Sequence, residues 1–254
     1  MSIHKTEAIV IKTFDFRETS LIASLYTKDF GKINVILKGI RAEPGKFAST
    51  LEPFSHNEIV FYKKRNGGLH LVSQCDLKDN LLPLRGDVTK VTMASIMVEL
   101  LDAIMPVEEV NFDIFDFSLS CLKAMCDYSY FDKIPTIFKI KILSLSGFKP
   151  HLDSCISCDD RIMGLSKFSI SLGGLLCQQC FRKDVRARGI YRGTVATIMH
   201  IERNCLADNL RLGINPQIKR ELDSILQSFI EFHIEKKLKS QNVLDKLKLA
   251  EVKI

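Results

Sequence analysis

The sequence predicts an α+β protein of several domains: a small five-stranded barrel, then a mostly helical region with a four-cysteine segment inserted into it. Three observations support this prediction. Short β-branched and aromatic stretches fill the first 80 residues, apolar residues at helical spacing follow, and two closely spaced cysteine pairs interrupt the helical pattern. The length of 254 residues is compatible with two or three domains.

The first 80 residues contain five segments with the composition of β-strands, at residues 7–13, 20–26, 33–38, 59–63 and 69–76. Asn66-Gly67 is a strong hairpin signal between the last two, and residues 29–32 form a second hairpin connection. Five strands in this length fit a small closed barrel, of which the OB-fold is the commonest nucleic-acid binder. A five-stranded barrel without any ligand is the alternative.

Beyond Pro83 the apolar residues recur with the period of an α-helix until Pro106, at Val91, Ala94, Val98, Leu101 and Met105. Further helices are predicted over residues 112–128 and 135–146, the second with Pro135 at its first position. The last predicted helix has Asn215 as N-cap and Pro216 at its first position. We expect its apolar stripe to be core, with members Ile218, Leu222, Ile225, Leu226, Phe229 and Phe232.

Two C-x2-C pairs, formed by Cys155 with Cys158 and by Cys177 with Cys180, are separated by 18 residues. This spacing is typical of a four-cysteine zinc site, because each pair can supply two thiolates from a tight turn. Gly173-Gly174 provides a bend before the second pair. Four thiolates leave no open position on the metal, so we expect one structural Zn²⁺ in a zinc ribbon. Ordinary cysteines or one redox pair are the alternatives.

Four further cysteines, Cys75, Cys121, Cys126 and Cys205, have no partner at ligand spacing and are expected to be small buried hydrophobic residues.

These strand, helix and cysteine patterns predict four segments: residues 1–80, the OB-fold; 81–150, the first part of the helical domain; 151–185, the zinc-binding insertion; and 186–254, the C-terminal helical part. No basic stretch followed by an apolar one opens the sequence, and no run of about 18 apolar residues occurs. A cytoplasmic location is expected.

The net charge of +6 is unevenly distributed. Residues 1–80 carry 12 basic and 9 acidic side chains, residues 81–180 carry 9 and 12, and residues 181–254 carry 15 and 9. In the first segment the cations alternate with aromatic residues, a mixture suited to single-stranded nucleic acid. The candidate DNA-binding residues are Lys12, Arg17, Lys28, Lys32, Lys38, Arg41, Lys46, Lys63, Lys64 and Arg65. Alternatively, the charges solvate the surface and most of the aromatic residues fill the barrel.

Enzyme motifs fail on inspection. The stretch from Gly39 to Gly45-Lys46 has five residues between its glycines, and Phe47 where a phosphate-binding loop needs Ser or Thr. His56-Asn57-Glu58 and His200-Ile201-Glu202 match half of a zinc-deaminase motif, but Ser154 and Leu176 stand where its proline belongs. We therefore expect a non-enzymatic protein, with a zinc hydrolase or deaminase as the enzymatic alternative.

Lys38-Gly39-Ile40-Arg41 followed by Leu51-Glu52-Pro53-Phe54 resembles the N-terminal signature of the RecO family. The cysteine-bearing segments 145–158 and 173–180, and Leu238-Lys239-Ser240 near the end, resemble the same family in order and spacing. One departure is Ala42-Glu43-Pro44, where many relatives keep more basic residues.

The resemblance implies an N-terminal OB-fold and a helical C-terminal region, often with zinc. It implies binding of single- and double-stranded DNA and annealing of complementary strands in recombinational repair at the nucleoid. It also implies partnership with RecR and with the acidic C-terminal tail of the single-stranded-DNA-binding protein (SSB), so that RecA is loaded onto coated strands. The rival interpretation is a zinc-ribbon module for protein interaction whose affinity for DNA is incidental.

Overall fold

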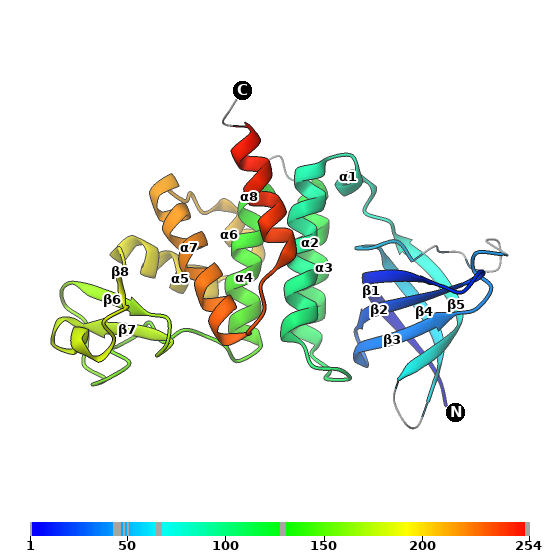
Figure 1. Ribbon diagram of the computed structural model, residues 1–254, viewed down its shortest axis with the longest axis horizontal. Helices are drawn as coiled ribbons and strands as arrows, with labels where there is room; N and C mark the ends of the chain where they lie inside the picture. Colours follow the sequence, from blue (N-terminus) through cyan, green and yellow to red (C-terminus); the bar gives the residue numbers. More distant parts are fainter. Residues whose placement is uncertain are drawn as a thin grey trace. The chain divides into compact units, whose positions relative to one another are not determined.

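The computed structural model of the chain describes residues 2–42, 47, 49, 51–64, 68–127 and 131–251 (Figure 1). The chain folds into two compact units. Unit 1 comprises Met1–Asp132 and Lys239–Ile254, and unit 2 comprises Lys133–Leu238. Unit 2 is therefore inserted into the chain of unit 1. No described helix is long and apolar enough to cross a membrane.

Unit 1 begins with a closed five-stranded barrel in the order β1-β2-β3-β5-β4. Its strands are β1 (Ser2–Phe16), β2 (Ser20–Thr27), β3 (Gly31–Leu37), β4 (His56–Lys63) and β5 (Leu69–Asp79). All pairs are antiparallel except β3 with β5, which run parallel. The predicted OB-type barrel is confirmed, and so is the β2–β3 hairpin, which turns at Gly31 with φ +62°. The Asn66-Gly67 hairpin signal lies outside the described residues.

Strand β1 is twice as long as predicted because it serves two neighbours. Its first half pairs with β4, with Ser2 opposite Lys63, and its second half pairs with β2, with Phe16 opposite Ser20. Ala8 and Ile9 pair with both neighbours, and a register irregularity between Val10 and Lys12 follows within the pairing with β2. The strand therefore closes the barrel by bending.

The barrel interior is a continuous apolar core. Its fully buried members include Leu25, Val35, Ile59 and Phe61. Of the aromatic residues near the basic side chains, Tyr26, Phe47 and Phe61 are buried, whereas Phe14 is 56% exposed.

The helices of unit 1 are α1 (Leu82–Arg85), α2 (Val88–Ile104), α3 (Phe112–Asp127) and α8 (Lys239–Glu251). Helix α2 begins three residues before the predicted pattern because Asp87 caps it, accepting hydrogen bonds from the N–H groups of Thr89 and Lys90. Helices α2 and α8 pack together, and both Glu99 carboxylate oxygens accept N–H bonds from Lys239 and Ser240 at the start of α8.

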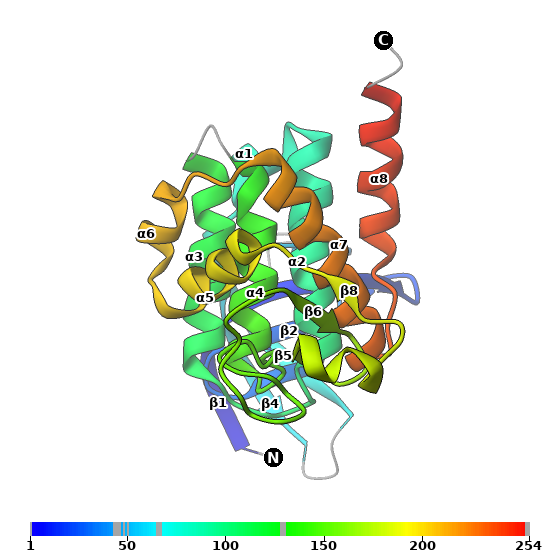
Figure 2. The same cartoon turned by 90° about the vertical axis from the view of Figure 1, so that its left-hand side faces the viewer.

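Unit 2 contains α4 (Ile134–Leu145), α5 (Arg192–Arg203), α6 (Leu206–Arg211) and α7 (Pro216–His233). A three-stranded ribbon lies next to α7 (Figure 2). Its central strand is β6 (Ser166–Ser169), with β7 (Gly174–Cys177) and β8 (Arg188–Gly189) on either side. Asn215 and Pro216 open α7 as predicted. Pro135, predicted at the first position of its helix, is at the second.

The apolar stripe of α7 requires one correction. Leu222, Leu226 and Phe229 are buried, but Phe232 is 53% exposed. Helical spacing assigned its ring to the core, yet the described part of unit 2 leaves that ring largely in solvent.

Candidate metal centre and nucleic-acid interface

The four predicted cysteines come together in the ribbon of unit 2. Cys155 and Cys158 lie in a tight turn, which closes through the N–H of Asp159 donating to the carbonyl of Cys155. Cys177 ends β7, and Cys180 lies in the short 3-10 helix Gln178–Lys183. Because β6 and β7 form an antiparallel hairpin, the chain folds back and brings the second pair opposite the first. The predicted fold-back is therefore present.

The geometry of the four sulfurs fits a tetrahedral metal. All four Sγ atoms lie within 4.8 Å of one another, and those of Cys158 and Cys177 are 3.7 Å apart. A tetrahedral zinc with Zn–S bonds of about 2.3 Å has sulfurs about 3.8 Å apart. The cysteines are thus arranged as metal ligands, and four ligands would leave no site for substrate.

Backbone N–H groups favour thiolate at Cys155, whereas the pKa values of the Cys158 and Cys180 thiols are raised. Burial raises the pKa of the Cys155 thiol, but N–H groups of Cys177, Ser157 and Cys158 outweigh it and lower that pKa to about 6. The Cys177 N–H lies 3.4 Å from the Cys155 sulfur. Such N–H···S bonds orient ligand sulfurs as well as stabilising their charge.

Two glycines position the second cysteine pair. Gly173 has φ +77°, which favours glycine at the turn before β7. A Cβ atom at Gly174 would lie 2.7 Å from the carbonyl oxygen of His151, so only glycine lets β7 approach that segment. The predicted bend is confirmed, with close packing as a second reason for it.

The remaining cysteines match their prediction only in part. Cys75 and Cys121 are fully buried, and burial raises the pKa of both thiols. Cys126 is half-buried. Cys205 is exposed at the start of α6, with its sulfur 3.1 Å from the Asp208 carboxylate, so its assignment to the core was wrong.

Several predicted DNA-binding lysines of the barrel already have carboxylate partners on the helical part of unit 1. Lys12 and Lys32 both reach Asp102 of α2, at 2.8 and 3.2 Å. Lys28 pairs with Asp116 of α3 at 3.0 Å, and Lys63 with Glu108 at 2.8 Å. The sequence of the barrel alone does not reveal these acidic partners, although the net negative charge of residues 81–180 indicates that acidic side chains are available.

Other predicted cations are more accessible to a ligand. Arg41 is exposed and pairs within the barrel with Asp15 at 3.3 Å. Arg17 in the β1–β2 turn, Lys38 after β3 and Lys64 after β4 are exposed, and none has an ion-pair partner among the described residues. Lys46 and Arg65 lie outside the described part of the chain. In five-stranded barrels of this type the β1–β2 and β4–β5 loops rim the nucleic-acid face, and Arg17 and Lys64 belong to them.

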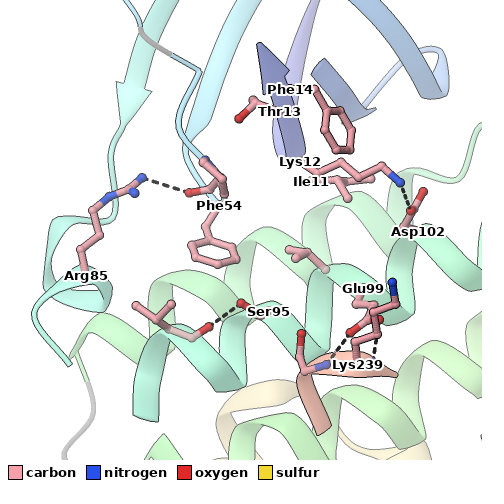
Figure 3. A pocket seen from close by; sticks show the side chains of 14 residues that line it. Ile11, Lys12, Thr13, Phe14, Phe54, Arg85, Ser95, Glu99, Asp102 and Lys239 are labelled. Atoms are coloured by element: carbon pink, nitrogen blue, oxygen red, sulfur yellow. Dashed lines mark hydrogen bonds and ion pairs between the residues drawn. The ribbon is translucent and has the colours of Figure 1, made fainter. Parts of the chain in front are cut away.

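A pocket of about 820 Å³ lies between β1 and α2 (Figure 3). Figure 3 shows Lys12 bonded to Asp102 at one side, Arg85 reaching the segment before Phe54 at the other, and Phe14 at the edge. Lys239 is the only cation lining it without an ion-pair partner among the described residues. The pocket therefore combines apolar walls with little free charge.

The histidines of the failed enzyme motifs have structural surroundings. His56 is buried in β4, with its Nε2 atom 2.7 Å from Glu7 Oε2. His200 lies in α5, away from the cysteine cluster in sequence, and the buried Glu202 carboxylate lies 3.1 Å from Lys149 Nζ. Neither motif contributes to the four-ligand cluster.

Comparison with known proteins places these features in a family. The model described as Recombination protein O N terminal matches residues 1–81, and the one described as Recombination protein O C terminal matches residues 85–242. The DNA repair protein RecO of Desulforamulus reducens is 30% identical over 248 residues, covering 97% of this chain and 96% of the relative. That of Alkaliphilus metalliredigens is 30% identical over 233 residues, covering 91% and 94%. The chain therefore belongs to the RecO family of DNA repair proteins.

Proposed function

We propose that this protein is a non-enzymatic, cytoplasmic recombination mediator associated with the nucleoid. It binds single- and double-stranded DNA and anneals complementary strands. With RecR, it helps to load RecA onto single strands coated by SSB. The observation that supports this proposal best is the family match along nearly the whole chain, combined with a five-stranded barrel that carries exposed, unpaired cations in its described loops.

Annealing requires no covalent chemistry. Two strands repel each other through their phosphates, so a protein accelerates pairing by neutralising both and keeping the bases accessible. Within the barrel, Arg17, Lys38 and Lys64 are the cations best placed to contact phosphates, because they are exposed and have no ion-pair partner among the described residues. We keep Arg41, Lys46 and Arg65 in the same proposed surface. For Lys12, Lys28, Lys32 and Lys63, contact with DNA would compete with existing ion pairs.

We propose Zn²⁺ as the metal held by Cys155, Cys158, Cys177 and Cys180. When bound, it supplies a fixed cross-link between the two cysteine turns and no reactive position. The protein's own contribution is the hairpin of β6 and β7 and the N–H donors that orient the thiolates. We also retain the division into an OB-fold at 1–80, helical segments at 81–150 and 186–254, and a zinc insertion at 151–185.

Binding and annealing can be tested together with the full-length protein. We expect titration with a fluorescent single strand to show binding that weakens steeply with salt, and mixing of complementary strands to show accelerated pairing. A salt-independent affinity with no annealing would favour the rival interpretation, a zinc-ribbon interaction module. One observation favours that rival: the apolar side chains of Met163 and Leu165 in the ribbon are 75% and 74% exposed. Exposed apolar side chains that lie together are typical of surfaces that bind other proteins.

The partner proposal has its own test. Deleting the acidic tail of the cognate SSB should abolish co-sedimentation with this protein and leave its binding to bare DNA intact. Equal co-sedimentation with full-length and truncated SSB would remove the mediator function while leaving a general DNA-binding protein.

A further inference from the structure

Unit 2 carries a cluster of basic side chains that no described residue neutralises by an ion pair, unlike the four barrel lysines that pair with Asp102, Asp116 and Glu108. Arg182 and Lys183 end the short helix after Cys180, and Arg186 and Arg188 follow in the next turn and in β8. All four are exposed. Over residues 182–188 four basic residues face a single acidic one, Asp184.

Two of these cations line a pocket. Arg186 and Arg188 from the ribbon lie opposite α7 around a cavity of about 450 Å³, with Lys237 from the segment after α7 at its edge. Ser171 and Ser228 add hydroxyl groups to the lining. The cavity is thus bordered by three cations that come from two different parts of unit 2.

The exposed ring of Phe232 lies in the same pocket. It stands edge-to-face against His233, with ring centroids 5.0 Å apart, so a neighbouring ring restrains it. An aromatic face beside cations is the combination that binds a nucleotide, since the ring stacks on a base while the cations contact phosphate.

The walls of the pocket are held together before any ligand arrives. A ring nitrogen of His233 lies 2.8 Å from the carbonyl oxygen of Ile170, and Phe168 of β6 packs against Phe229 of α7 with centroids 6.1 Å apart. Ribbon and helix therefore form one continuous surface around the cavity. Because folding has already ordered this surface, a ligand that binds there loses little affinity to ordering it.

Two carboxylates, those of Asp184 and Glu231, also line the pocket and limit the classes of ligand that can bind there. Asp184 accepts hydrogen bonds from Ser169 and Ser171 and from the N–H of Arg186, which lower the pKa of its carboxyl group. Glu231 accepts a bond from Gln227. These carboxylates repel the carboxylates of an acidic peptide, whereas a base such as thymine offers them an N–H donor in addition to the phosphates that the cations contact. The lining therefore favours nucleic acid.

We propose that this pocket, formed by Arg186, Arg188, Lys237 and Phe232, binds a second DNA strand as a single-stranded segment. The inference rests on the proposed annealing function and deepens it, because annealing needs two strands on one protein. The barrel would hold one strand and unit 2 the other.

The test measures binding of a second strand to the full-length, metal-loaded protein. A biotinylated polythymidine strand on beads is saturated with protein and washed, and a fluorescent polythymidine strand is then offered at several salt concentrations. The variant is Arg186→Ala/Arg188→Ala/Lys237→Ala. The matched control is Arg211→Ala/Arg220→Ala/Lys236→Ala, which removes the same charge from exposed positions of unit 2 that do not line the pocket and have no ion-pair partner among the described residues.

We expect the variant to bind the first strand within about twofold of the unaltered protein, while its log–log salt slope for the second strand falls by about 2, at about 0.7 per lost phosphate contact. The annealing rate should fall with it, and the control should behave like the unaltered protein. Equal metal content and melting curves would show that the ribbon is intact in both.

Phe232 provides an independent measurement. Phe232→Leu should weaken second-strand binding about tenfold at every salt concentration without changing the slope, and Phe232→Tyr should restore it, because stacking needs a ring and no charge. A second strand containing 5-iodouracil should crosslink on irradiation to the peptide that carries Phe232.

Three outcomes would overturn the inference: second-strand capture and annealing unchanged in the triple variant, an equal loss in the control, or loss of SSB-tail binding with DNA capture intact, which would make this a peptide site. If the unaltered protein binds one strand and never a second, the inference fails and DNA binding survives. If it binds no strand at all, the proposed function itself has failed.

Discussion

The barrel and the ribbon are both small β structures with basic surfaces, but their charges are used differently. Four of the barrel's candidate DNA-binding lysines face carboxylates in the helical part of unit 1. Within the described residues, Arg186 and Arg188 of the ribbon have no such partner. A count of cations along the sequence treats these two groups as equal, yet only the first would have to break an ion pair to contact an external anion. Charge must therefore be judged together with its partners.

The two structures also differ in what stabilises them. The barrel has a continuous buried core with aromatic and aliphatic members such as Phe61 and Leu25. The ribbon has a small cluster in which Cys155, Leu176 and Cys180 are the main buried residues. Because so small a core buries little apolar surface, we expect the ribbon to depend on a cross-link that the barrel does not need.

The largest effect is expected at the cysteines. Cys155→Ser or Cys177→Ser should abolish binding of the proposed zinc and unfold the ribbon, since structural zinc contributes about 10–16 kcal/mol of apparent binding free energy. Elemental analysis gives the metal content, and hydrogen exchange should show loss of protection in β6 and β7 with the barrel strands unaffected. Freshly purified, never-chelated protein without metal, whose cysteine variants melt normally, would show that the ribbon needs no cross-link.

The barrel should respond to loss of apolar volume. Phe61→Ala removes a ring that is fully buried, and we expect the free energy of unfolding to fall by about 3–5 kcal/mol. Denaturant titration measures it. Phe14→Ala, at a position 56% exposed, is the matched control and should change stability by less than about 0.5 kcal/mol. Similar losses from both changes would mean that the exposed ring is buried in solution.

The difference between paired and unpaired cations can be measured with DNA. Arg17→Ala/Lys38→Ala/Lys64→Ala should lower the log–log salt slope of single-strand binding by about 2, at about 0.7 per phosphate contact. Lys12→Ala/Lys28→Ala/Lys32→Ala should lower it by less than half as much, because those lysines are already bonded to Asp102 and Asp116. A larger change in the second variant would show that these ion pairs open when DNA binds.

The smallest effect is expected on the stability of the barrel at acidic pH. Burial lowers the pKa of His56 below its ordinary value near 6.5, although Glu7 beside it acts in the opposite direction. The unfolded chain then binds more protons below about pH 6.5, so stability is lost as the pH falls through that value and levels off below the folded pKa. His56→Gln should flatten the decline in barrel stability. An unchanged pH profile in this variant would assign the decline to other groups, such as His70, whose pKa burial also lowers.

The sequence predicted what depends on local pattern. The inner parts of the five strands, the cap at Asn215 and the cysteine cluster follow from alternation, capping chemistry and ligand spacing, each contained within a few residues. The ends of β1 were missed because Ser2 and Ile3 are exposed and carry no alternating signal. The helices α5, α6 and α8 were missed as well.

Partners far apart in the sequence could not be predicted. The sequence around Lys12 does not predict that the Asp102 carboxylate lies 2.8 Å from its ammonium group. The spacing of apolar residues along α7 likewise does not predict that Phe232 is exposed. Both depend on how separate elements pack. The prediction of DNA contacts along the barrel stays a prediction. The candidate residues now fall into two groups: lysines that would have to break an ion pair to bind DNA, and cations that have no ion pair among the described residues.

The pairing of Glu99 with the first N–H groups of α8 has a consequence for biosynthesis. Residues 105–238 separate α2 from α8, so at about 5–20 residues per second a ribosome needs roughly 7 to 27 s to deliver the second helix after the first. During that interval the barrel has all its strands, while the face of α2 that receives α8 is uncovered. A nascent chain stalled before Lys239 would thus expose a surface for chaperones that the finished protein conceals.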